Sequence, residues 1–115
     1  MAATESAESD LALLQRCVGD GRLLLTYHVD MRLRERRVAR HLVMGSVDTY
    51  QIIEHYPASQ ASRCLPSCRI RAEDTEGVIH VLLALDREGN NVRVFTVYRP
   101  DPRQWETGFT RRKRP

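Results

Sequence analysis

The second half of the chain carries the pattern that most restricts what it can fold into. Apolar and polar residues alternate over residues 50–56 and again over residues 68–73, as they do in strands with one buried face. Residues 78–85 are apolar except for His80, which is typical of a central strand, and a turn then leads into a further strand over residues 92–98. The pattern predicts a four-stranded, mainly antiparallel sheet.

The first half of the chain predicts helices instead. Ser9 can cap a first helix that carries an apolar stripe, and Leu23–Leu25 indicate a short strand. Two further helices are expected, from Thr26 to about Arg36 and from Val38 to Met44. Because helices precede the strands, we expect an α+β domain in which N-terminal helices pack on one face of the sheet.

A chain of 115 residues, with 42% hydrophobic and 29% charged residues, suits one small globular domain without a separate cofactor domain, and we expect no cofactor. We predict a disordered lead-in at residues 1–8, a single domain over 9–108 and a basic tail over 109–115. The longest apolar run, Val81–Leu85, is too short to cross a bilayer, and the acidic N-terminus lacks a signal-peptide core. These features predict a cytoplasmic protein that does not bind membranes.

Positive charge is concentrated in two stretches. Met31–Arg40 and Arg111–Arg114 each carry a net charge of +4, whereas the whole chain carries +3. All basic residues except Lys113 are arginines, whose planar guanidinium binds phosphate or carboxylate through paired hydrogen bonds. The stretches therefore predict contacts with nucleic acid or an acidic protein, although a solvated helix face would give the same pattern. The candidate phosphate-binding residues are Arg32, Arg36, Arg111, Arg112, Lys113 and Arg114.

The second predicted helix places an imidazole beside two guanidiniums. His28, Arg32 and Arg36 are spaced at i, i+4 and i+8, so they share one helix face. A histidine can move a proton near neutral pH, and guanidiniums can hold a phosphodiester and stabilise the charge that builds on it during cleavage. His28 is therefore a candidate catalytic residue, and packing at the helix N-terminus is the alternative.

His80 is the second candidate catalytic residue. Its place in the most apolar strand predicts a ring that is buried or lies on the sheet face opposite the helices. One interpretation is a hydrogen-bonded core histidine without a catalytic role. The other is a general acid or base that reaches a cleft on the sheet face, with Thr96 or Tyr98 as its hydrogen-bond partner.

The three cysteines, in a chain without a secretion signal, argue against a disulfide framework. Cys64 and Cys68 could supply two zinc ligands, and His55 or His80 could complete the site. One cysteine pair is not a recognised zinc motif, so no metal site is predicted, and Cys17 is expected to pack within the first helix.

The C-terminal segment contains two prolines, followed by the only tryptophan of the chain, Trp105. Trp105 is expected to cap the edge of the core. The alternative is that Trp105 stacks on a base while Arg99 and Arg103 contact phosphates.

Several motifs in order along the chain carry a family resemblance. They are His28-x3-Arg32-Leu33-x-Glu35-Arg36-x-Val38, Glu54-x-Tyr56-Pro57, Pro66-Ser67-Cys68, Ile79-His80-Val81 and Thr96-Val97-Tyr98-x-Pro100-Asp101-Pro102-x-x-Trp105. Over residues 24–112, the chain resembles a family of small bacterial domains of unknown function that is likened to the RelE and ParE superfamily of toxins. It departs from that family at Arg37, where the family turns through glycine, and at Ala39, where a serine would cap the next helix.

The resemblance implies a RelE-like α+β fold, with helices on a curved antiparallel sheet, and descent from ribonucleases that work without a metal ion. His28, Arg32, Arg36 and His80 occupy the polar motif positions of that family. A shared fold does not by itself carry a shared activity.

Two hypotheses for function follow. The first is a metal-independent ribonuclease or RNA-binding protein, acting on free RNA or at the ribosome, in which His28 and His80 exchange protons while the arginines hold phosphates. The second is a non-catalytic module that binds nucleic acid or an acidic, antitoxin-like protein through the basic helix and tail.

Overall fold

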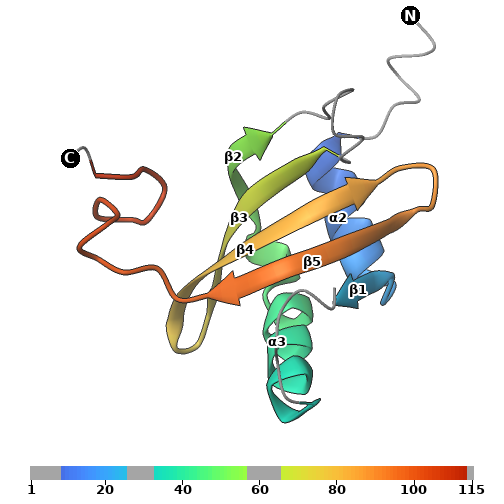
Figure 1. Ribbon diagram of the computed structural model, residues 1–115, viewed down its shortest axis with the longest axis horizontal. Helices are drawn as coiled ribbons and strands as arrows, with labels where there is room; N and C mark the ends of the chain where they lie inside the picture. Colours follow the sequence, from blue (N-terminus) through green and yellow to red (C-terminus); the bar gives the residue numbers. More distant parts are fainter. Residues whose placement is uncertain (1–8, 26–32, 57–65, 114–115) are drawn as a thin grey trace, which may run out of the picture.

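The computed structural model describes residues 9–25, 33–56 and 66–113. Its elements in chain order are helix α2 (Asp10–Gly19), strand β1 (Leu23–Leu25), helix α3 (Leu33–Gly45), a 3₁₀ turn η1 (Val47–Thr49) and strands β2 (Gln51–Tyr56), β3 (Ser67–Asp74), β4 (Gly77–Asp86) and β5 (Asn91–Tyr98). The predicted α+β class is confirmed, with the helices N-terminal to most of the sheet (Figure 1).

The sheet has five strands in the order β1-β5-β4-β3-β2, so the predicted four strands were one too few. Strands β2 to β5 form the predicted antiparallel array. Strand β1 adds a parallel edge, in which Leu23, Leu24 and Leu25 pair with Val92, Arg93 and Val94. Because β1 has only three residues, its own pattern gives too little information to identify its partner, and the sheet is mixed rather than purely antiparallel.

Helix α2 begins as the sequence predicts. The hydroxyl of Ser9 accepts a hydrogen bond from the Ala12 N–H at 3.1 Å, which satisfies one of the free amides of the first turn. The helix ends before Gly21, whose φ of 76° suits a residue without a Cβ. Its buried side chains are Leu13, Leu14, Cys17 and Val18.

Helix α3 corrects the prediction of two helices separated near Arg37. It runs without a break from Leu33 to Gly45, because this stretch has no internal glycine or proline to interrupt it. The predicted start of the earlier helix, at Thr26, lies outside the described residues.

The two faces of the sheet differ in chemistry. The face that α2 and α3 cover is apolar and includes Ile70, Val81 and Val94, packed with Leu14 and Val43. We call the opposite face the open face. Strand register places on it the side chains of Glu54, Arg69, Arg71, His80 and Tyr98, and Tyr56 follows two residues after Glu54 on the same side.

Residues 99–113, which we call the strap, continue from the end of β5 (Figure 1). The strap contacts the open face through backbone and side-chain groups of Gly108, Phe109 and Arg112. Trp105 is 2% exposed, and its ring packs against His80 on the open face. No helix in the described ranges is long and apolar enough to span a membrane.

The core predicts a contrast between two leucines. Replacing the fully buried Leu14 by alanine should lower the free energy of unfolding by about 2–5 kcal/mol, because the substitution removes buried methyl groups and leaves a cavity. Leu24 is 55% exposed, so Leu24→Ala should change the free energy of unfolding by about 0.5 kcal/mol or less. Urea denaturation of both variants tests this, and equal losses would contradict the assigned core.

Candidate functional site

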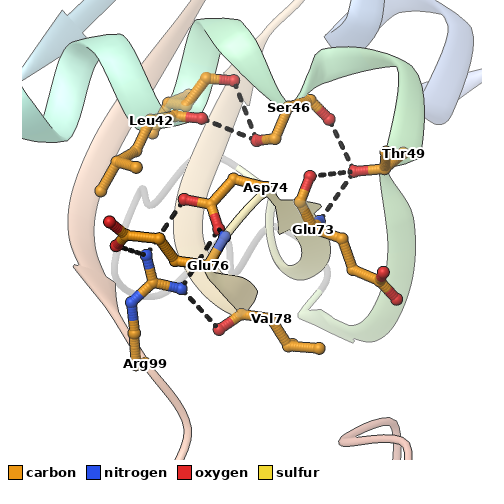
Figure 2. Close-up of polar contacts among 9 residues, drawn as sticks. Leu42, Ser46, Thr49, Glu73, Asp74, Glu76, Val78 and Arg99 are labelled. Atoms are coloured by element: carbon orange, nitrogen blue, oxygen red, sulfur yellow. Dashed lines mark hydrogen bonds and ion pairs between the residues drawn. The ribbon is translucent and has the colours of Figure 1, made fainter.

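A recess of about 640 Å³ lies between the C-terminal end of α3 and the β3–β4 turn. In Figure 2, Arg99 lies between Asp74 and Glu76 and donates to their carboxylates at 3.0 and 3.2 Å. The Thr49 hydroxyl accepts from the Glu73 N–H at 2.8 Å, which ties η1 to β3. Since these polar groups bind one another, we assign them to joining η1 and the start of the strap to the β3–β4 hairpin.

The open face holds a different kind of cluster, centred on Glu54. Arg69 donates from Nε to Glu54 Oε1 at 2.7 Å, and Arg112 donates from Nε to Glu54 Oε2 at 2.8 Å. Arg112 also reaches Oε1 from Nη2 at 3.3 Å, and the Tyr56 hydroxyl donates to the same oxygen. One carboxylate therefore holds two guanidiniums and a phenol from β2, β3 and the strap.

This cluster keeps Glu54 ionised. The hydrogen bonds from Arg112, which has the largest effect, and from Tyr56 and Arg69 together lower the pKa of Glu54 to about 2, against the opposing effect of burial. Burial disfavours the charge of Arg69, but its bonds to Glu54 and Tyr56 keep the pKa of Arg69 above the ordinary value. Near neutral pH the cluster is thus an anion between two permanent cations.

His80 lies next to this cluster and is fully buried. Its Nε2 is 2.8 Å from the Phe109 carbonyl oxygen, which can only accept, so Nε2 carries the proton. Its Nδ1 then accepts from the Tyr98 hydroxyl at 3.1 Å, and Tyr98 in turn accepts from Arg69 Nη1 at 2.6 Å. The predicted partner Tyr98 is therefore the one that His80 uses, and both ring nitrogens are engaged.

The surroundings of His80 favour the neutral imidazole. Burial lowers the pKa of His80 below its ordinary value, the charges of Arg69 and Arg71 lower it further, and the Phe109 carbonyl acts in the opposite direction. The Trp105 ring packs edge-on against the imidazole with centroids 4.4 Å apart. The strap thus encloses the ring from the side opposite the core.

The strap contains a strained turn at Gly108 and Phe109. Gly108 and Phe109 have φ values of 94° and 60°, and a left-handed phenylalanine costs about 1 kcal/mol. That conformation turns the carbonyls of Gly108 and Phe109 to the sheet, where Arg71 Nε donates to the first at 2.6 Å and His80 to the second. The guanidinium of Arg112 lies 4.8 Å from the Trp105 ring centroid, a cation–π contact.

The sequence-predicted site residues are divided among several places. His28, Arg32 and Arg114 lie outside the described residues, and Arg36 lies in α3 with a side chain that is also outside the description. Arg112 belongs to the Glu54 cluster, whereas Arg111 and Lys113 are exposed on the strap. The predicted meeting of His28 and His80 therefore stays a prediction.

The cysteines fit the packing interpretation. Cys17 and Cys68 are buried free thiols, and burial raises the pKa of Cys68 to about 12. Within residues 9–25, 33–56 and 66–113, no group of three or more His, Cys, Asp or Glu side chains could hold a metal ion. Cys64, the other member of the considered zinc pair, lies outside these ranges.

Sequence reasoning missed Glu54 and Arg69 as site residues. The signal was present in part, because the alternation of β2 and β3 already places both on the polar side of their strands. Their pairing depends on strand register, in which Glu54 lies opposite Arg69 and a bulge precedes Glu54. Register across the long connection after β2 is not encoded in either strand alone.

Comparison with known proteins gives one match. A family model described as a domain of unknown function, DUF4258, matches residues 25–99, which run from the last residue of β1 to just past the end of β5 and include Glu54, Arg69 and His80. No curated protein and no solved structure matches the chain.

The environment of His80 predicts a stability change at mildly acidic pH. Because an unfolded histidine takes up a proton near pH 6.5 while folded His80 resists it, the free energy of unfolding should fall as the pH drops below about 6.5. Histidine NMR shifts between about pH 5 and pH 8 should place the His80 titration below the ordinary value. In His80→Gln this part of the pH dependence should disappear, and titration of His80 above the ordinary value would contradict the assigned burial.

Proposed function

We propose that this chain, which belongs to the DUF4258 family of domains of unknown function, binds RNA through the open face of its sheet and the strap. The proposal rests on one observation above all. Two guanidiniums far apart in sequence, Arg69 and Arg112, converge on one carboxylate at this face. Guanidinium binds carboxylate and phosphate with the same paired geometry, so the pair is a phosphate site that Glu54 fills in the free protein.

The accessibility of the two arginines suits this role. The side chain of Arg69 is 12% exposed and is fixed by Glu54 and Tyr98, whereas Arg112 is 52% exposed. A phosphate can therefore compete for Arg112 from solvent while Arg69 stays in place. Arg111 and Lys113, exposed on either side of Arg112, add positive charge for neighbouring phosphates.

The resemblance to the RelE and ParE superfamily supports the same proposal. That superfamily contains proteins that act on RNA without a metal ion, and the polar face of its sheet would correspond here to the open face. This correspondence is an analogy of fold, and the assignment to RNA depends on the charges at Arg69 and Arg112 rather than on the analogy.

Binding is better supported than cleavage. Glu54 is a weak base because its pKa is about 2, which disfavours a role as general base near neutral pH. His80 has both ring nitrogens engaged and is fully buried. A substrate oxygen would have to take the place of the Phe109 carbonyl to reach Nε2.

One observation nevertheless favours a second candidate function, metal-independent RNA cleavage. Arg69, Tyr98 and His80 form a continuous hydrogen-bonded chain next to the proposed phosphate site. A neutral imidazole in such a chain can accept a proton from a 2′-hydroxyl, and Arg69 can stabilise the charge on the phosphate. In this candidate, the strap must leave His80 before the reaction, and the imidazole proton must move from Nε2 to Nδ1, where the Tyr98 oxygen accepts it. Nε2 is then free to take the proton of the 2′-hydroxyl.

The phosphate site predicts opposite effects for two variants that break the same ion pair. Arg112→Gln should weaken RNA binding roughly tenfold by removing a charge-assisted contact. Glu54→Gln should strengthen RNA binding, because it removes the competing negative charge and leaves both guanidiniums. Fluorescence anisotropy with a labelled oligoribonucleotide, across a salt series, measures both effects.

Arg87→Gln is the matched control. Arg87 also pairs with a carboxylate, that of Asp10 at the start of α2. Asp10 in turn contacts His55, whose side chain lies on the face of β2 opposite Glu54. The Arg87→Gln variant loses the same charge as Arg112→Gln, and its RNA affinity should stay within about twofold of wild type. If Arg112→Gln and Glu54→Gln both weaken RNA binding, the ion pair between Arg112 and Glu54 has only a structural role. If an acidic polypeptide binds and RNA does not, the proposal is wrong.

The second candidate predicts cleavage of RNA in the presence of EDTA, lost in His80→Ala and reduced in Tyr98→Phe, which removes only the hydroxyl between Arg69 and His80. His28→Ala, assayed in parallel, tests the predicted second proton carrier. Gel analysis of defined oligoribonucleotides gives the readout. RNA that stays intact while salt-sensitive binding persists would exclude cleavage and leave binding as the activity.

A further inference from the structure

Tyr56 stands apart from the other aromatic side chains that the structure describes. It is 40% exposed, whereas Tyr50 and Trp105 are buried and Phe95, Tyr98 and Phe109 are partly buried. At 40% exposure the residue keeps a large part of its surface in contact with water, and that part adds no stability to the sheet. Its exposure beside a charged cluster requires a different explanation.

The position of Tyr56 is tied to the phosphate site. It is the last residue of β2, on the same face as Glu54, and its hydroxyl donates to Glu54 Oε1. Arg69 Nε donates to that same oxygen, and Arg112 Nε donates to the other oxygen of the carboxylate. The phenol and the two guanidiniums are thus neighbours around a single carboxyl group.

The hydroxyl bond also fixes the ring before any ligand arrives. A tyrosine has two side-chain torsions, and anchoring its hydroxyl on Glu54 removes most of its freedom. A ligand that stacks on the ring therefore does not have to order it. Preorganised aromatic surfaces next to cationic groups are what proteins use to bind bases and phosphates of one strand together.

We infer that Tyr56 is a stacking platform for an unpaired base whose phosphate lies at Arg69 and Arg112, so the substrate class is single-stranded RNA. This inference rests on the proposed function and sharpens it. A base inside a duplex already stacks on its neighbours and is paired, so its face is not available to Tyr56. Arg112 alone would contact the phosphates of either form.

The experiment compares two substitutions on two RNAs. Tyr56→Leu keeps an apolar side chain but removes the ring, and Tyr56→Phe keeps the ring but removes the hydroxyl. Each is measured by anisotropy with an unstructured oligoribonucleotide and with the same strand annealed to its complement. The thermal unfolding of each variant is measured first, and we expect it to match wild type because Tyr56 is at an exposed strand end.

Tyr56→Leu should weaken single-strand binding about tenfold, the loss expected for one base stack, while duplex affinity stays unchanged. Tyr56→Phe should lose clearly less single-strand affinity than Tyr56→Leu, because it keeps the ring and loses only the hydroxyl that anchors it. An equal loss for Tyr56→Leu on single strand and duplex, or equal losses for Tyr56→Leu and Tyr56→Phe, would overturn the inference while leaving RNA binding in place. If wild type binds neither RNA, the proposed function is wrong and the inference is wrong with it.

Discussion

In the central strands, successive side chains project to opposite faces of the sheet, and the helices can bury only one of the two faces. Ile70, Val81 and Val94 occupy the face that α2 and α3 cover, so the side chains between them necessarily project from the opposite face. That face has no helix among the described elements to shield it. Its buried polar groups must find partners from the sheet itself or from the strap, since an unpaired buried polar group is costly.

The strap meets this requirement at His80. An imidazole in the centre of β4 needs a donor and an acceptor, and Tyr98 and the Phe109 carbonyl provide them. Placing that carbonyl requires a left-handed phenylalanine. The strain of about 1 kcal/mol is offset by pairing a buried ring nitrogen, whose loss of a partner would cost about 1–3 kcal/mol. His80 is therefore one of the groups that set the path of the strap, together with Arg71 and Glu54.

Strands β2 and β3 were predictable from their period of two and β4 from its apolar run, and α2 was predictable because Ser9 and its apolar stripe are local. The pairing of β1 with β5 could not be predicted, since three leucines do not specify a partner strand almost 70 residues away. The continuity of α3 was missed because a break was predicted between Arg36 and Val38, where no glycine or proline ends the helix. A residue that merely lacks a turn signal does not end a helix.

The candidate site likewise contains residues that the sequence could predict and contacts that it could not. His80 and its partner Tyr98 follow from adjacent antiparallel strands, and Arg112 follows from the local concentration of basic residues. The meeting of Arg112 with Glu54 joins residues 58 positions apart through a strap without regular structure. Contacts of that kind depend on the three-dimensional path of the chain, which no periodicity records.

Tyr98 connects His80 to the ion pair between Arg69 and Glu54 through two hydrogen bonds. While the imidazole is neutral, the Tyr98 hydroxyl donates to it and keeps a lone pair for Arg69. A protonated ring would point a second N–H at Tyr98, whose own hydroxyl would then have to turn away, with the charges of Arg69 and Arg71 opposing the new cation and that of Glu54 favouring it. The neutral form of His80 therefore fits the observed arrangement, in which Tyr98 donates to His80 and accepts from Arg69. Through Tyr98, the imidazole beneath the strap is linked to Arg69, the less exposed of the two guanidiniums at the proposed phosphate site.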